Sequence, residues 1–271
     1  MFRGWGILKM NEDVLKAAQI QALLSGVAEK IKVVCVEKTE STNADLLAML
    51  PQNKLPQAVI AEIQTKGRGR EGRTWWSEKG NSITFSLAWP FAQAIDSLRG
   101  LSLVIGVAIV RALLKWGVQV QLKWPNDVLK EGKKLAGVLI ETRYVEKQKL
   151  LWAVIGVGMN LFVSDQLEET IGHAVADAPW LGQLDRTTLI GELLNQMACV
   201  LALFERQGFT AFQQEWNQAH AYHEKWVKII DQGHVVMEGV AKGVDQEGYL
   251  LLEAENEKIR VQVGHVSLRE G

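Results

Sequence analysis

A short basic loop, Lys66 to Trp76, holds the residue types best suited to chemistry on a phosphate. Its sequence, KGRGREGRTWW, contains three glycines, three arginines and one lysine, and it ends in two adjacent tryptophans. Glycine lets backbone N–H groups approach a ligand closely, and a guanidinium group binds phosphate oxygens through paired donors. The loop therefore predicts a phosphate site. The alternative from the loop alone is a solvated basic surface loop, because basic runs are common.

No recognisable protein nucleophile accompanies this loop in the sequence. The chain has no G-x-S-x-G motif, and neither of its two cysteines has a histidine nearby. The remaining candidates are the cations Arg68, Arg70, Arg73, Lys123 and Lys134. Such a set suits a reaction in which a substrate carboxylate attacks the α-phosphate of ATP. The enzyme then brings two anions together with positive groups and Mg²⁺, and preorganised charges contribute roughly 10²–10³ in rate per donor.

Other residues that could carry chemistry have simpler interpretations. Residues 156–160 (GVGMN) lack the third glycine and the following helix of a dinucleotide fingerprint. His220 and His223 are spaced for one helix face without a carboxylate that would complete a zinc signature, so we interpret them as surface helix residues. Cys35 and Cys199 lie in apolar runs and are expected to be small core hydrophobes.

Composition limits the classes of function. The chain has 271 residues, 48% hydrophobic and 23% charged, which allows one large domain or a large and a small one. A net charge of -1 gives no global attraction to nucleic acid or acidic membranes, so a basic function must be local. The longest apolar stretch, residues 101–114, is interrupted by Arg111 and too short to span a bilayer. Without a recognisable signal peptide, we expect a cytoplasmic protein that does not enter membranes.

The hydrophobic pattern predicts alternating helices and strands. Three small polar residues, Ser41, Thr42 and Asn43, sit at a strand-to-helix junction, where they either start the helix or orient a polar ligand. Thr42 with Asp45 three residues on resembles a capping box, so local sequence favours the cap. The expected elements are a helix over 11–24, a strand over 31–37, a short helix after 41–43, strands over 57–64 and 81–90, and a buried helix over 97–116.

The second half of the chain continues this pattern and then changes character. Residues 118–143 predict two strands and a hairpin, 149–162 a buried strand, and 187–206 and 209–222 two helices. Residues 163–186, which include Trp180, lack a pattern and are expected to lie over or beside the site. From about Lys225 only short strands and turns occur, as is typical of a small β-barrel or sandwich. Trp124 and Trp152 are expected in the core.

Five motifs occur in the order STN (41–43), GRGREGRTW (67–75), KWPNDV (123–128), KKLAG (133–137) and GVGMN (156–160). This order of motifs resembles the biotin protein ligase family. The resemblance covers about residues 38–162, and the β-rich end also resembles that family's C-terminal domain. It implies an α+β fold: a mixed β-sheet with helices packed on it, like class II aminoacyl-tRNA synthetases and biotin–lipoate ligases, plus a small C-terminal SH3-like β-barrel. We place a catalytic domain at 1–224 and the β domain at 225–271.

The resemblance also implies an activity. Members of this family make biotinyl-5′-AMP from biotin and MgATP and then transfer biotin to one lysine of a biotin carboxyl carrier protein, here that of acetyl-CoA carboxylase. Some members carry an N-terminal winged helix-turn-helix and repress transcription. Only 40 residues precede Ser41 in this chain, so we expect neither DNA binding nor repressor activity. The sequence leaves a monomer and a homodimer open, and it leaves open whether the basic loop is ordered without ligand.

Site residues follow from the resemblance, motif by motif. Arg70, Lys134 and Lys123 are the expected catalytic residues. Asp127 is open between a Mg²⁺-linked and a structural role, and no residue is assigned to the metal with certainty. The biotin site is expected to contain Ser41, Thr42, Asn43, Gln64, Gly67, Arg68, Gly69, Arg70 and Lys134. The ATP and adenylate site is expected to contain Arg68, Arg70, Arg73, Trp75, Lys123, Asn126, Lys134 and Asn160.

Two rival functions remain at this stage. A lipoate or octanoate ligase or transferase would share the expected fold, but its arginine-glycine motif differs from GRGREGRTW. A nucleotide- or RNA-binding module would use the basic loop in another way. The near-zero net charge and the lack of an extended basic stripe argue against that module.

Overall fold

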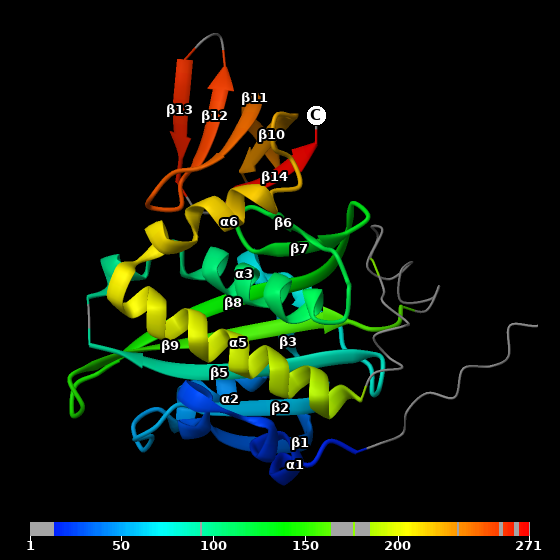
Figure 1. The fold of residues 1–271 in the computed structure, drawn as a ribbon, viewed down its shortest axis with the longest axis vertical. Coiled ribbons are helices and arrows are strands. Elements are labelled where there is room, and N and C mark those ends of the chain that lie inside the picture. Colours follow the sequence, from blue (N-terminus) through cyan, green and yellow to red (C-terminus); the bar gives the residue numbers. More distant parts are fainter. Residues whose placement is uncertain are drawn as a thin grey trace, which may run out of the picture.

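A mixed seven-stranded sheet forms the centre of the protein (Figure 1). The computed structural model describes residues 14–92, 94–163, 176, 185–231, 233–254, 257–262 and 266–270. β1 and β2 are parallel, and all other neighbours in this sheet are antiparallel. The strands follow the order β1 (Lys32–Thr39), β2 (Gln57–Gln64), β5 (Ser82–Phe91), β9 (Leu150–Asn160), β8 (Lys133–Val145), β7 (Asp127–Lys130) and β6 (Gln121–Lys123).

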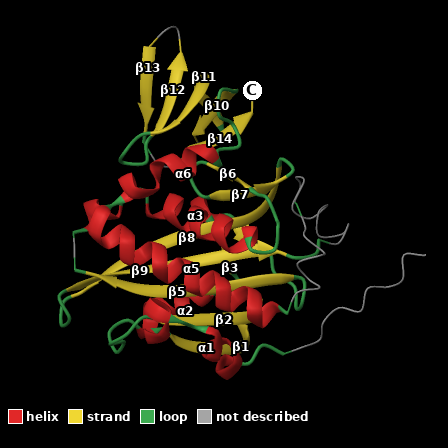
Figure 2. Ribbon diagram, viewed as in Figure 1, coloured by secondary structure: helices red, strands yellow, loops and turns green. Residues whose placement is uncertain are grey.

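Helices cover both faces of this sheet (Figure 2). On one face α1 (Ala17–Leu23), α3 (Leu101–Leu114) and α5 (Arg186–Gln207) pack together over the larger core. On the other face α2 (Thr42–Met49) covers only part of the sheet, over a smaller core. The rest of that face, which none of the described helices covers, is where a ligand can reach the strands.

Two helical stretches, Ile95–Leu114 and Arg186–Gln207, are long and apolar enough to cross a membrane by length and composition alone. However, 56% and 61% of their most apolar windows are buried inside the protein. α3 is buried over most of its circumference because it lies between the sheet and α5, which explains its continuous apolar sequence. Both stretches therefore have the burial of core helices.

Side-chain alternation along the strands separates the core from the uncovered face. In β9, Ile155 and Val157 point into the larger core, while Trp152 and Val154 pack under α2. Further along the α2 side of the same strand the bulky residues give way to small ones, at Gly156 and Gly158. On this face, β9 therefore carries bulky core residues at one end and small residues, which leave open space, at the other.

A second, five-stranded antiparallel sheet lies at the C-terminal end of the chain (Figure 1). Its first strand starts at Trp226, two residues beyond our expected domain boundary. The preceding α6 (Gln213–Gln218) leads into a segment that runs beside β6, where Leu122 and His220 form a parallel bridge. The strand order is β13 (Glu257–Val261), β12 (Leu250–Ala254), β11 (His234–Val244), β10 (Trp226–Asp231) and β14 (Val266–Glu270).

Several expected elements have different bounds in the structure. The first helix begins only at Ala17, and residues 11–13 lie outside the described residues. Residues 118–143 form three strands rather than two, because the turn at residues 124–126 reverses the chain a second time. The helix expected over 209–222 is a 3₁₀ turn, Phe209–Phe212, followed by α6, and it ends at Gln218.

The predictions for Cys199 and His220 are wrong. Cys199 is exposed because it falls on the outer face of α5, whereas Cys35 is half-buried against the core. His220 is only 4% exposed and lies after α6, not on a helix surface, since its segment packs beside β6. His223 is exposed, as expected, but it lies in a turn rather than on a helix. Trp124 and Trp152 are fully buried, which confirms them as core residues.

Candidate active site

A cavity lies on the uncovered face of the main sheet, between the start of α2, the Lys66–Trp76 loop and the β6–β7 turn. Its walls come from widely separated parts of the sequence, including the end of the C-terminal sheet. All the expected site residues line it except Gly67, and Asp127 does so as well. The lining residues include Ser41, Thr42, Asn43, Gln64, Arg68, Arg70, Glu71, Arg73, Trp75, Ser86, Lys123, Trp124, Asn126, Asp127, Lys134, Gly137, Leu139, Gly156, Gly158, Asn160 and Arg269.

One end of the cavity is a network of neutral hydrogen-bonding groups. The Gln64 side-chain carbonyl accepts from the Thr42 backbone N–H at 2.8 Å and lies 3.1 Å from the Thr42 hydroxyl. The Thr42 hydroxyl is also 2.6 Å from that of Ser86, which donates to the Asn43 side-chain carbonyl. Ser86 is fully buried. Fixed neutral donors and acceptors of this kind suit a polar, uncharged group such as a urea.

The capping interpretation of Thr42 is wrong in this structure. Ser41 is the N-cap residue of α2, and its side chain makes no capping bond. The first N–H of the helix instead donates to Gln64 from the neighbouring strand, and Asp45 accepts from the Thr39 hydroxyl at 2.7 Å. The small polar side chains are consequently turned into the cavity network.

Glu141 connects this neutral end to the basic loop. Its Oε2 accepts from the Asn43 amide at 2.8 Å and from the Arg68 guanidinium at 2.7 Å. Glu141 lies on β8, two residues beyond Leu139 in the row that faces the cavity. One carboxylate therefore holds a residue of α2 and a residue of the loop in a common position.

Glycines form the floor of the cavity. Gly137 on β8 is paired directly with Gly158 on β9. A Cβ at Gly156 would lie 2.5 Å from the Asn43 Oδ1 atom. A Cβ at Gly158 would collide with the indole of Trp75, whose nearest ring atom lies 2.2 Å away. The GVGMN motif therefore provides space for side chains and ligand rather than a nucleotide fingerprint.

The basic loop is a small hairpin over the cavity. β3 (Gly67–Arg68) pairs antiparallel with β4 (Thr74–Trp75). At its tip Glu71 has φ 58 and Gly72 has φ 72. Gly67 lies at the base, where a Cβ would be 2.3 Å from the Trp75 carbonyl oxygen, so a side chain at this position would separate the two strands.

Cations gather at the other end of the cavity. Arg70 donates to the Asn126 side-chain carbonyl at 3.2 Å, and Lys134 Nζ lies 2.7 Å from Asp127 Oδ1. Lys123 completes this group from β6. Lys123, Asp127 and Lys134 meet because β6, β7 and β8 form consecutive hairpins. Arg70 reaches them from the separate β3–β4 hairpin.

Lys123 is the most perturbed cation of this group. Its pKa is lowered from 10.5 to about 8, mainly by burial and secondarily by the nearby positive charge of Arg269, while Asp127 opposes the shift. Burial also lowers the pKa of Arg70, opposed by Glu71 and Asp127. Positive groups that repel one another in a partly dry cleft are preorganised to receive an anion.

Ser86, Glu141 and Arg269 are polar or charged residues of the site that the sequence did not predict. Ser86 and Glu141 belong to strands, and only the sheet register shows that they face the site. Arg269 comes from β14, at the far end of the chain, and carries no local motif. Trp180 and most of residues 163–186 lie outside the described residues.

The cavity thus joins a neutral hydrogen-bonding end to a cationic end beneath a glycine-rich hairpin. Together with the mixed sheet, this arrangement defines a ligase that activates a small carboxylic acid with ATP.

Comparison with known proteins specifies the family. Residues 33–160 match the Biotin/lipoate A/B protein ligase family, and residues 222–269 match the Biotin protein ligase C terminal domain. The chain is 34% identical over 259 residues to the bifunctional ligase/repressor BirA of Escherichia coli strain K12, covering 95% of this chain and 79% of the relative. This chain belongs to the biotin protein ligase family.

Two further relatives agree with this placement. The biotin–[acetyl-CoA-carboxylase] ligase of Paracoccus denitrificans is 30% identical over 222 residues, covering 79% of this chain and 91% of the relative. The solved structure of the biotin protein ligase from Aquifex aeolicus in complex with biotin and ATP has a TM-score of 0.74 at 25% identity. That alignment covers 88% of this chain and 99% of the other.

Proposed function

We propose that this protein activates biotin to biotinyl-5′-AMP with ATP and transfers biotin to a lysine of a biotin carboxyl carrier protein, that of acetyl-CoA carboxylase. The observation that carries the proposal is the meeting of the neutral and cationic ends of one cavity at the hairpin residues Arg68 and Arg70. The neutral end offers hydrogen-bonding partners for the bicyclic urea of biotin. The cationic end offers positive charge for a nucleoside triphosphate.

In the first step a biotin carboxylate oxygen attacks the α-phosphorus of ATP. A new P–O bond forms, the bond to the β-phosphate oxygen breaks, and pyrophosphate leaves. We assign Ser41, Thr42, Asn43 and Gln64 to the biotin head. Lys134 is assigned to the carboxylate and α-phosphate, because it is a cation that lines the same cavity.

The remaining cations are assigned to the phosphates. Lys123, Arg70 and Arg73 would offset the negative charge of the triphosphate, and Asn126 would hold Arg70 as it does in this structure at 3.2 Å. Arg269 is added to this set because it lines the same cavity. Trp75 and Asn160 are assigned to the adenylate. Each preorganised donor of this kind contributes roughly 10²–10³ in rate.

Mg²⁺ fits this end of the cavity as a partner of the phosphates. Glu71 and Asp127 are carboxylates in the lining, and each is already paired with a cation, Arg73 or Lys134, at 2.7 Å. Mg²⁺ usually takes one or two carboxylates together with substrate phosphates. We assign Asp127 as the carboxylate that would hold it, where it would neutralise charge on the leaving pyrophosphate.

In the second step the ε-amine of the carrier lysine attacks the acyl carbon of the mixed anhydride. An amide bond forms, AMP leaves and the amine loses a proton. The enzyme has no need of its own nucleophile in either step. Its contribution is to position the pair and to shield the adenylate from water beneath the hairpin. We place this activity in the cytoplasm.

A transfer assay tests this function. The purified chain is incubated with MgATP, a carrier domain and either biotin or lipoate, and the mass of the carrier is measured. The proposal predicts one biotinyl group on the carrier and no lipoyl group. Lipoyl transfer at an equal or higher rate would instead favour the rival lipoate ligase.

A further inference from the structure

The turn Asp245–Tyr249 between β11 and β12 connects the C-terminal sheet to the active site through Trp124. Trp124 follows Lys123 in the chain and lines the cavity, yet its side chain is fully buried. Its indole N–H donates to the carbonyl oxygen of Gly248 at 3.2 Å, 124 residues away in sequence. A buried N–H needs an acceptor, so this bond fixes the rotation of the indole.

Gly248 can make this approach only without a side chain. It has φ +84, and a Cβ would lie 3.0 Å from the Cα atom of Gly100 and 3.1 Å from Leu103. Gly100 is the N-cap of α3 and also has positive φ, +76. Two glycines therefore bring the turn into backbone contact with the start of a core helix.

The same helix start holds the next residue of the KWPND motif. The Ser102 hydroxyl, on the first turn of α3, donates to the Pro125 carbonyl at 3.0 Å. Trp124 and Pro125 are thus held from two sides, by the C-terminal turn and by α3. The residues on either side of this pair, Lys123 and Asn126, are those assigned to the phosphate end of the cavity.

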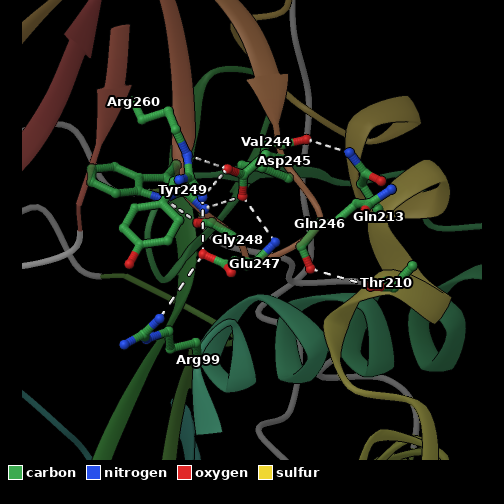
Figure 3. Close-up of polar contacts among 11 residues, drawn as sticks. Arg99, Thr210, Gln213, Val244, Asp245, Gln246, Glu247, Gly248, Tyr249 and Arg260 are labelled. Carbon is green, nitrogen blue, oxygen red and sulfur yellow. Dashed lines mark hydrogen bonds and ion pairs between the residues drawn. The ribbon is translucent and has the colours of Figure 1, made fainter. Parts of the chain in front are cut away.

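The turn is rigid by its own hydrogen bonds (Figure 3). Asp245 Oδ1 accepts from the backbone N–H groups of Glu247 at 2.9 Å and Tyr249 at 3.0 Å. Arg260 on β13 donates to Asp245 at 2.6 Å and to Glu247 at 2.9 Å, and it lies over the Tyr249 ring, 4.3 Å from the centroid. The turn consequently presents the Gly248 carbonyl in one fixed orientation.

The turn is also anchored to the main domain at its edges. The Thr210 hydroxyl donates to the Gln246 carbonyl at 3.4 Å, and Gln213 donates to Val244 at 2.9 Å (Figure 3). On the other side the Arg99 guanidinium nitrogen Nη1 lies 3.9 Å from the Glu247 carboxylate oxygen Oε2. The C-terminal sheet therefore cannot shift relative to α3 and α6 without moving the acceptor of the Trp124 indole.

We propose that the Asp245–Tyr249 turn is a positioning element for the ATP end of the active site, acting through the Gly248–Trp124 hydrogen bond on Lys123 and Asn126. The inference rests on the proposed function, because it presumes that these residues bind the triphosphate. Trp124 and Gly248 are positioning residues and touch no substrate in this scheme. The biotin end is held by other strands and is independent of the turn.

Trp124→Phe tests this inference, because it removes the N–H donor and keeps a buried aromatic ring. We expect the KM for ATP in biotin-dependent pyrophosphate exchange to rise about tenfold, while the dissociation constant for biotin stays unchanged. Trp152→Phe is the matched control. Trp152 is equally buried, and its indole N–H donates to Gln148 at 2.7 Å, away from the cavity.

Gly248→Ala gives a second, independent perturbation of the same bond. Its control is Gly233→Ala, at a glycine with nearly the same φ, +86, where an added Cβ meets no atom within 4 Å. Gly248→Ala should raise the KM for ATP and Gly233→Ala should not. If Gly248→Ala does not fold, the two tryptophan variants decide alone.

The outcomes of these experiments distinguish a failure of the positioning role from a failure of the proposed function. A parental KM for ATP in Trp124→Phe, or an equal loss of biotin and ATP affinity, would overturn the positioning role and leave the enzyme intact. An absence of biotin-dependent exchange in the parent chain would refute the proposed function itself. Calorimetric titration with ATP measures the same difference without turnover.

Discussion

Lys134 Nζ lies 2.7 Å from Asp127 Oδ1, and this ion pair joins the KKLAG and KWPND motifs across the β7–β8 hairpin. The hairpin turns through Glu131 and Gly132, both with positive φ. The pair is partly shielded, with side chains 30% and 19% exposed. Asp127 therefore holds the ammonium group at the cationic end of the cavity.

Replacing Lys134 tests its assignment to the reacting groups. Lys134→Ala should lower the rate of biotin-dependent ATP–pyrophosphate exchange by about 10²-fold or more, because a preorganised charge at the developing phosphate is lost. The adjacent Lys133 is exposed and serves as the matched control, Lys133→Ala. Exchange at the parental rate in Lys134→Ala would refute the role given to this lysine.

Replacing Arg70 tests whether the hairpin covers the adenylate. Arg70→Gly removes a guanidinium that is hydrogen-bonded to Asn126, and it also adds backbone freedom to the hairpin. We expect faster release of biotinyl-5′-AMP in single-turnover trapping experiments. Lys66→Gly adds the same freedom at an exposed residue paired with Glu40, outside the cavity, and should release adenylate at the parental rate. Equal release by both variants and the parent would contradict the covering role.

The lowered pKa of Lys123 predicts a pH dependence of ATP binding. In the ligand-free protein this ammonium is charged below about pH 8 and neutral above it. Polyphosphate binds the charged form, so the affinity for ATP should fall as pH rises through 8, by up to about tenfold per unit. Lys123→Arg keeps its charge in this range and should flatten the profile. Identical slopes for the parent and this variant would show that another group titrates.

His220 predicts a loss of stability in acid. Its side chain is buried against Trp216, with ring centroids 4.8 Å apart, and burial lowers its pKa from 6.5 to about 4, with a smaller contribution from His223. Between these values the unfolded chain binds a proton that the folded chain does not, so stability falls as pH drops below 6.5. At pH 5 the loss is about 2 kcal/mol.

His220→Phe should remove this loss while keeping the aromatic contact. The thermal unfolding midpoint of the variant should fall less than that of the parent between pH 7.5 and pH 5. His234→Phe, at an exposed strand residue, should behave like the parent. A parallel decrease for His220→Phe and the parent would assign the acid sensitivity to other groups.

Local patterns predict most strands because the strands are rich in apolar and β-branched residues and are bounded by turn residues. The strand expected over 57–64 has the same bounds in the structure. The order of the strands could not be read from periodicity, since pairing such as β2 with β5 depends on contacts between distant segments. His220 shows the same limit. Its burial results from the bridge to Leu122, which no local pattern reveals.

The cavity residues that belong to sequence motifs could be predicted. Those that face the cavity only because of the register of their strands could not. Arg70, Lys123 and Lys134 stand in motifs and all line the cavity, although their roles in catalysis stay predictions. Ser86 and Glu141 lie in strands and belong to no motif. Only the register of the sheet shows that their polar side chains face the site. The sequence favours a capping role for Thr42, but its backbone N–H donates to Gln64 on β2, a long-range contact that local sequence does not show.

Exchange of radiolabelled pyrophosphate into ATP, measured on the purified chain with and without biotin, tests the central claim most directly. If the substrate carboxylate is the nucleophile at the α-phosphate, label should enter ATP only when biotin and Mg²⁺ are present. Lipoate should not replace biotin. Exchange that proceeds without biotin, or none in its presence, would contradict the assignment of this cavity to biotin adenylation.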